Sequence, residues 1–179
     1  MKKNKKIVLH VILFLLLTIL SSAFQSVIWY QFFGHFVAPY FSFILFTYFG
    51  LDKDSWRSLI YCYGIVYLNS FFTYSSIGML YMSSMVSFVF LFLVKNRVYW
   101  PGPAYFTIMT SAGLFLFHLT YIITSFTSES HTTPLMIFQR LLQIAMTSVC
   151  AYFFYEIIKK LDTSLKSSTL TEIKGEAHG

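Results

Sequence analysis

The sequence is poor in charge. Only 11% of its 179 residues are Asp, Glu, Lys or Arg, and only seven of these are acidic. Soluble globular domains carry about 25% charged residues. With 56% hydrophobic residues, a chain of this size cannot bury its apolar side chains in one core and still present a polar surface to water. The composition excludes an ordinary soluble enzyme, a disordered chain and a typical nucleic-acid-binding domain, and it predicts an integral membrane protein.

Motifs that carry chemistry are missing as well. The two cysteines, Cys62 and Cys150, lie in apolar runs without Cys-x-x-Cys or Cys/His spacing, so we expect free thiols and no structural zinc. The sequence has no GxSxG, HExxH or Walker pattern, and no acidic residue lies at the centre of an apolar run. These absences argue against a hydrolase, an intramembrane aspartyl protease and a carboxylate-based cation transporter. We predict no catalytic residues, no metal site and no cofactor.

Six apolar stretches are long enough, or nearly so, to cross about 30 Å of hydrocarbon as helices. Runs such as residues 11–17 do not alternate in polarity, which favours helices over the strands of a barrel. The predicted fold is all-α, a single domain over residues 1–161 that forms a bundle of six transmembrane helices. A polar tail over residues 162–179 is expected to be disordered. The predicted spans cover residues 7–30, 36–51, 56–73, 76–94, 102–126 and 134–158.

Basic residues are unevenly distributed between the connections of these spans. With the N-terminus inside, twelve of the thirteen Lys and Arg residues fall in inner segments, and the other, Arg140, falls within the last span. Lys and Arg accumulate on the cytoplasmic side, so we predict that both termini are cytoplasmic. The net charge of +6 then needs no nucleic acid as a partner. The lysine-rich start and Ser21-Ser22-Ala23 also resemble a secretory signal, but apolar residues resume at 27–30, and we expect a retained anchor.

Polar side chains in the last span form the clearest candidate site. Gln139 and Arg140 share one helix face with Gln143, because they lie four and three residues before it. Polar residues inside a membrane are costly and usually face the bundle interior. This stripe therefore meets a partner helix or an anionic ligand, or else Arg140 extends along the helix to the outer surface. The sequence leaves both interpretations open.

Other polar residues in the spans favour packing. We expect Asn69 to make a hydrogen bond between helices rather than to bind a ligand. Ser83, Ser84 and Ser87 give the fourth span a face of small residues, which suits close helix contact. His118 has no second histidine or carboxylate at metal-ligand spacing, so we expect a packed polar side chain.

The overall pattern resembles the MreD family, the rod shape-determining membrane proteins of bacteria. Pro39 opens the second predicted span, a short charged turn follows at residues 52–57, and Gly64 and Gly78 stand in the third and fourth spans. The sequence departs from the family where the usual acidic residue of the third span is replaced by Asn69. The high aromatic content indicates a divergent member.

This resemblance implies a non-enzymatic scaffold of the cell-elongation complex, which directs peptidoglycan synthesis, in the bacterial inner (cytoplasmic) membrane. Its implied partners are membrane lipid, an MreC-like single-span protein, a RodA-like glycosyltransferase with its transpeptidase, and MreB-like filaments. The six-helix pattern also resembles the substrate-binding subunits of energy-coupling-factor vitamin transporters, which is the alternative function. The candidate partner-binding residues are Pro39, Gly64, Asn69, Gly78, Gln139, Arg140 and Gln143.

Overall fold

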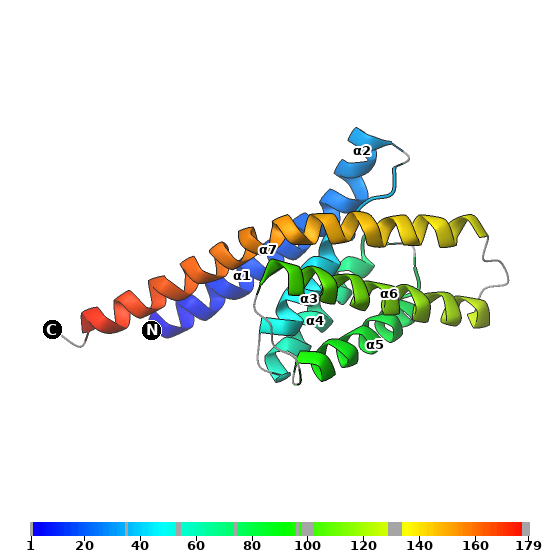
Figure 1. Cartoon of the computed structure of the whole chain (residues 1–179). Coiled ribbons are helices and arrows are strands. Elements are labelled where there is room, and N and C mark those ends of the chain that lie inside the picture. The colour runs from blue at the N-terminus through cyan, green and yellow to red at the C-terminus, as the bar shows by residue number, and fades with distance from the viewer. Residues whose placement is uncertain are drawn as a thin grey trace.

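A computed structural model describes residues 2–34, 36–52, 55–73, 75–95, 97, 102–128 and 134–176. Within these ranges the chain is helical and contains no strand (Figure 1). The elements are α1 (Lys2–Ala23), the π-helical η1 (Phe24–Ile28), α2 (Trp29–Phe33), α3 (Phe41–Asp52), α4 (Ser55–Ser70), α5 (Ile77–Lys95), α6 (Pro103–Ser128) and α7 (Pro134–Glu176). The all-α class predicted from the sequence is confirmed.

Four helical stretches are long and apolar enough to cross a membrane, and they correspond to the first, fourth, fifth and sixth predicted spans. They are Phe14–Phe33, Ile77–Lys95, Pro103–Thr127 and Ile137–Leu161. The second and third predicted spans correspond to α3 and α4, which have 12 and 16 residues. At 1.5 Å per residue they rise only about 18 and 24 Å. Neither helix reaches across about 30 Å of hydrocarbon by itself.

The first span is one continuous helical rod made of α1, η1 and α2. Ala23 and Ile28, at the two junctions, both have right-handed helical torsions. The rod ends at Gly34, which has a φ of 59° and whose N–H bonds the carbonyl of Tyr30 at 3.0 Å. A glycine with positive φ is a common way to end a helix, because it has no Cβ to clash.

The short helix α3 lies at the centre of the bundle. Every residue from 41 to 48 is buried, and α3 contacts α1, α4, α5, α6 and α7. Its Ile44 is 1% exposed, and the ring of Phe43 lies 5.7 Å from that of Phe117 on α6. A helix that is apolar on all sides is expected to be buried. This central position makes α3 the floor of the apolar groove described below.

Two predicted boundaries are wrong. The second span is not helical from residue 36: residues 37–40 are irregular and α3 begins at Phe41. Pro39 explains this, since proline lacks an N–H and disfavours helical torsions in the residue before it. The tail expected to be disordered instead continues α7 to Glu176. Residues 162–174 contain neither proline nor glycine, so nothing in the sequence interrupts the helix there.

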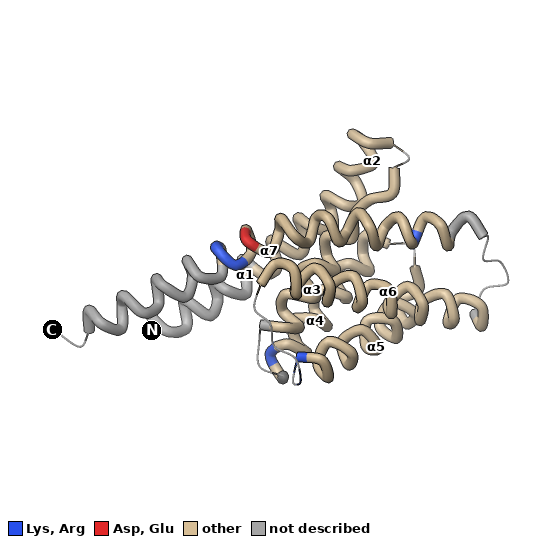
Figure 2. Tube along the Cα trace, viewed as in Figure 1, with Lys and Arg blue, Asp and Glu red and all other residues tan. Residues whose placement is uncertain are grey.

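The charged side chains distinguish the two ends of the bundle. Figure 2 shows the described Lys and Arg residues on α4, at the end of α5 and on the later part of α7. We call this the basic end, and it is the end at which α1 begins and α7 finishes (Figure 1). The single basic residue on the first half of α7 is Arg140, which lies near the start of that helix and so away from the basic end.

Candidate functional site

A pocket of about 570 Å³ opens at the end opposite the basic end, and we call it the polar pocket. Its lining includes the irregular stretch 37–40 that precedes α3. Ligand pockets in proteins are typically about 300–1,000 Å³. The lining side chains come from six separate segments: Gln25, Ser26, Tyr30, Val37, Ala38, Tyr40, Phe72, Thr73, Ser75, Leu80, Phe117, His118, Tyr121, Gln139, Arg140 and Gln143.

Arg140 is half-buried in the wall of this pocket and is held by uncharged groups. Its Nη1 lies 3.3 Å from Nδ1 of His118, and its Cζ lies 4.5 Å from the centre of the Tyr121 ring. A guanidinium only donates hydrogen bonds, so Nδ1 accepts and the neutral imidazole carries its proton on Nε2. The aromatic face attracts the cation, and the Tyr121 hydroxyl donates to Ser75 Oγ at 2.8 Å. The sequence left the direction of Arg140 open, and the structure places it in the pocket.

Among the side chains that the structure describes, no Asp or Glu lines the polar pocket with Arg140. Glu156 is the one Asp or Glu whose side chain falls within that set, and it lies 16 residues further along α7. This separation corresponds to about 24 Å of helix. The charge of Arg140 is therefore not balanced by that carboxylate.

Two further polar residues of α7 support the chain's own backbone. Gln143 Nε2 donates to the carbonyl of Ala38 at 2.9 Å, and the Tyr40 N–H donates to Thr147 Oγ1 at 2.8 Å. Irregular backbone at membrane depth is tolerated only where such groups are satisfied or line a cavity. Part of the polar stripe predicted as a partner or ligand contact thus holds residues 37–40 in place.

Beneath the pocket, Asn69 joins α4 to α3. Its Nδ2 donates to the Tyr40 hydroxyl at 2.9 Å, and Ser42 Oγ donates to its Oδ1 at 3.3 Å. This is a hydrogen bond between helices of the kind expected for Asn69. The residue is buried and does not line the polar pocket itself, so it positions Tyr40, whose side chain does.

The other predicted contact residues are dispersed. Pro39 is fully buried before α3, whereas Gln139 is exposed and lines the polar pocket. Gly64 faces α1, where an added Cβ would lie 3.6 Å from the Phe14 ring. Gly78 is exposed, and an added Cβ there would meet nothing within 4 Å. The structure therefore brings Gln139, Arg140 and Gln143 together and leaves Gly64 and Gly78 elsewhere.

The small-residue face of the fourth predicted span is buried and contacts α6 through Ser87. Ser83, Ser84 and Ser87 are all buried on α5. Ser87 Oγ donates to the carbonyl of Gly113 on α6 at 2.9 Å. These serines serve helix packing.

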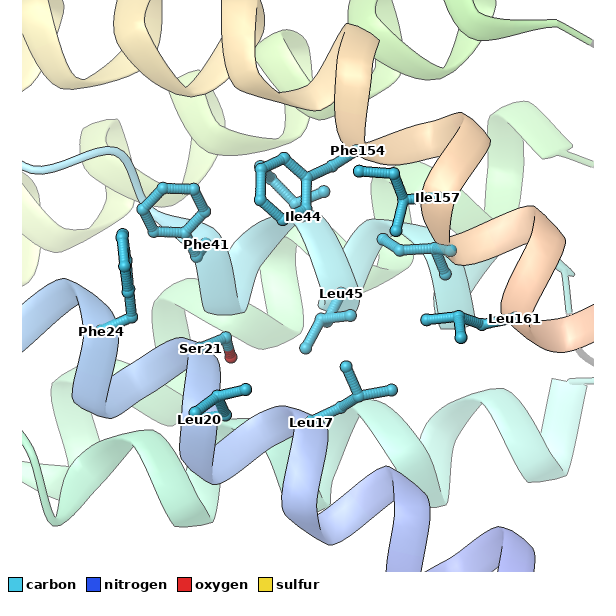
Figure 3. A pocket seen from close by; sticks show the side chains of 11 residues that line it. Leu17, Leu20, Ser21, Phe24, Phe41, Ile44, Leu45, Phe154, Ile157 and Leu161 are labelled. Carbon is cyan, nitrogen blue, oxygen red and sulfur yellow. The ribbon is translucent and has the colours of Figure 1, made fainter.

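A second hollow, which we call the apolar groove, lies between α1 and α7. It has a volume of about 250 Å³, and α3 forms its floor (Figure 3). Its lining is apolar except for Ser21, whose Oγ donates to the Thr18 carbonyl of its own helix at 2.9 Å. The lining residues are Leu17, Leu20, Ser21, Phe24, Phe41, Ile44, Leu45, Phe154, Ile157, Ile158 and Leu161.

Sequence reasoning missed the grouping of Arg140 with His118 and Tyr121. The two partners lie on α6 and Arg140 lies on α7, so no spacing in the sequence connects them. His118 was expected only as a packed polar residue, and it is indeed buried. The signal that existed was the presence of a basic residue and a histidine in consecutive spans.

Within the described part of the chain, no group of three His, Cys, Asp or Glu residues could hold a metal ion. Cys62 and Cys150 are free thiols. No protein-family model, curated protein or solved structure matches the chain. The function is therefore argued from the polar pocket and the apolar groove.

Proposed function

We propose that this protein is a non-enzymatic membrane scaffold of the bacterial cell-elongation complex, similar in role to MreD. The observation that carries the proposal is the apolar groove. Helices in a bilayer associate through packing and hydrogen bonds, because lipid tails are as apolar as their side chains. A groove between two helices, with a third as its floor, offers a partner's transmembrane helix contact on three sides. An MreC-like single-span protein is the partner whose chemistry fits this surface.

The structure of α1 and α7 is consistent with this role. In the 18-residue apolar windows of their two spanning stretches only 17% of the residues are buried within the chain, against 39% in that of α6. Exposed large apolar side chains continue along α7 beyond the groove, with Phe138 70% exposed and Phe153 65% exposed. These surfaces leave room for further helices, such as those of a RodA-like glycosyltransferase.

The test is purification of the tagged chain in a gentle detergent, followed by mass spectrometry of the proteins recovered with it. Ser21→Trp places a large ring in the groove and is expected to reduce recovery of a single-span partner severalfold or more. Met85→Trp is the matched control, because Met85 lies on α5 away from the groove and is 66% exposed. Equal recovery with both variants would show that the groove is not the binding site of the partner.

We also propose that the chain crosses the inner membrane six times with both ends in the cytoplasm. The placement of the described basic residues at one end supports this (Figure 2). In this topology α3 and α4 form a hairpin that completes the second and third spans together with residues 37–40. A cysteine at Thr127 should react with an impermeant maleimide in intact cells, and one at Arg97 only after the membrane is opened.

A second candidate function is the substrate-binding subunit of an energy-coupling-factor vitamin transporter. The polar pocket favours it, because such a subunit needs a ligand site that is open to the outside. The same purification separates the two candidates. Recovery of two ATPases with a membrane coupling protein would favour the transporter, and recovery of cell-wall synthases would favour the scaffold.

A further inference from the structure

We propose that the polar pocket binds an anionic group, a carboxylate or a phosphate, carried by a ligand with an apolar body. Arg140 supplies the positive charge, and the aromatic side chains of the wall pack against the apolar body. The proposal takes from the second candidate function the premise that the pocket is a ligand site, and it names the chemistry of that ligand. It does not depend on the apolar groove.

The first argument is the state of Arg140. A cation within a membrane span is costly, and such residues are usually paired or functional. Here the guanidinium is half-buried between a neutral imidazole, at 3.3 Å, and an aromatic ring, at 4.5 Å. It has five N–H donors in a planar fork, and the contact with His118 engages one of its nitrogens. The fork suits a carboxylate or a phosphate, which it can bind with two parallel hydrogen bonds.

The second argument is the composition of the wall. Among the described side chains that line the pocket, Arg140 is the one full charge, and none is acidic. Tyr30, Phe72 and Phe117 offer flat apolar surfaces, and Gln139 offers an exposed amide at the pocket. Most binding sites combine such apolar walls with a few polar groups that fix the ligand's orientation.

The third argument is the rigidity of the charged group's surroundings. The Tyr121 hydroxyl is anchored to Ser75, and Gln143, one turn along α7 from Arg140, is anchored to Ala38. These bonds join α6 to the segment before α5 and α7 to the segment before α3, and both segments line the pocket. A charge held in a preformed site loses less freedom when its ligand binds.

One acidic residue of the chain is a potential partner of Arg140 that would compete with the ligand. Glu129 is the sole acidic residue between α6 and α7, and it lies outside the described residues. If its carboxylate neutralises Arg140, the pocket has no charge to offer. The Glu129→Gln variant therefore belongs in the experiment.

The experiment uses the full-length chain in an uncharged detergent with two probes of the same shape, 2-naphthoate and the neutral 2-naphthamide. Affinity is read from the rise in Tm with probe concentration. We expect the wild type to bind the carboxylate about tenfold more tightly than the amide. Arg140→Gln should abolish this preference, Arg140→Lys should keep part of it, and Arg57→Gln, which removes an exposed cation of α4, should leave it unchanged.

Two arms identify the source of the anion. The first adds phosphatidylglycerol to nanodiscs of phosphatidylcholine. If this lipid displaces 2-naphthoate and is retained by the wild type but not by Arg140→Gln, the natural ligand is a lipid headgroup. If 2-naphthoate binds in an Arg140-dependent manner without competition from this lipid, the ligand comes from the aqueous phase. Either result supports an anion site.

Three results would overturn the proposal. The first is equal affinity of the wild type for the two probes. The second is that Arg57→Gln loses the preference for 2-naphthoate as fully as Arg140→Gln does. The third is that this preference is seen only in Glu129→Gln. If Arg140→Gln fails to fold, the comparison of the two probes on the wild type and on Arg140→Lys still decides. Ser21→Trp should keep the preference, so failure of the scaffold function and failure of anion binding are read on separate variants.

Discussion

The helices α3 and α7 are both apolar, but they occupy opposite environments. α3 has 12 residues and is buried from residue 41 to residue 48, whereas the spanning stretch of α7 has 25 residues, and only 17% of its 18-residue apolar window is buried. Hydropathy does not separate them, because lipid and protein interior are both apolar. Their lengths distinguish the two helices, since a helix of about 18 Å cannot reach across the hydrocarbon and must be enclosed by longer neighbours. The comparison shows how one short, enclosed helix can form the floor of the apolar groove between two longer helices.

The largest expected effect is a cavity in α3. Ile44→Ala removes a side chain that is 1% exposed, and we expect a loss of about 2–5 kcal/mol in the free energy of unfolding. Ile137→Ala on α7 is the matched control, because that side chain is 48% exposed, and its loss should stay below about 1 kcal/mol. Reversible denaturation in mixed micelles measures both. Equal losses would contradict the contrast between the two helices.

An intermediate effect is expected where α7 meets the start of α3. Thr147→Val keeps the shape of the side chain but leaves the buried Tyr40 N–H without its acceptor, at a cost of about 1 kcal/mol. Thr124→Val is the control, since Thr124 Oγ1 bonds carbonyls of its own helix. The difference between the unfolding free energies of the two variants measures how much the bond from Tyr40 to Thr147 stabilises residues 37–40. No difference would mean that another group satisfies this N–H.

The smallest effect is expected at Gly78 on α5. An alanine there meets no atom within 4 Å and improves helix propensity, so Gly78→Ala should stabilise the isolated chain by no more than about 1 kcal/mol. Gly34→Ala should be destabilising by contrast, because its φ of 59° is strained for alanine. Thermal unfolding in detergent compares them. A marked destabilisation by Gly78→Ala would show a close neighbour that the structure lacks.

The sequence predicted the helices well where the apolar runs were long. The fourth, fifth and sixth predicted spans begin within one residue of α5, α6 and α7, because polar turns and prolines bound them. The start of α3 was predicted five residues too early, since a run of apolar residues with one proline does not reveal which of them leave the helix. That choice depends on Gln143 and Thr147, more than a hundred residues away.

The candidate site was predicted only in part. The sequence singled out Arg140 with Gln139 and Gln143 by their helical spacing, and all three line the polar pocket. It could not show that Gln143 binds this chain's own backbone, or that His118 and Tyr121 approach Arg140. Contacts between helices depend on their relative rotation, and a single sequence without aligned relatives carries little information on rotation.

The π-helical turn η1 has a consequence for how the two hollows can change over time. A π-helical turn corresponds to one extra residue in an otherwise α-helical rod, and each residue turns the helix by about 100°. Leu17 and Leu20, before η1, face the groove, while Gln25, Ser26 and Tyr30, within and after it, line the pocket. Loss of a single codon after that of Phe24, the last residue of the rod that lines the groove, would rotate the later residues alone. The pocket could thus acquire a new lining in one genetic event while the groove kept its own.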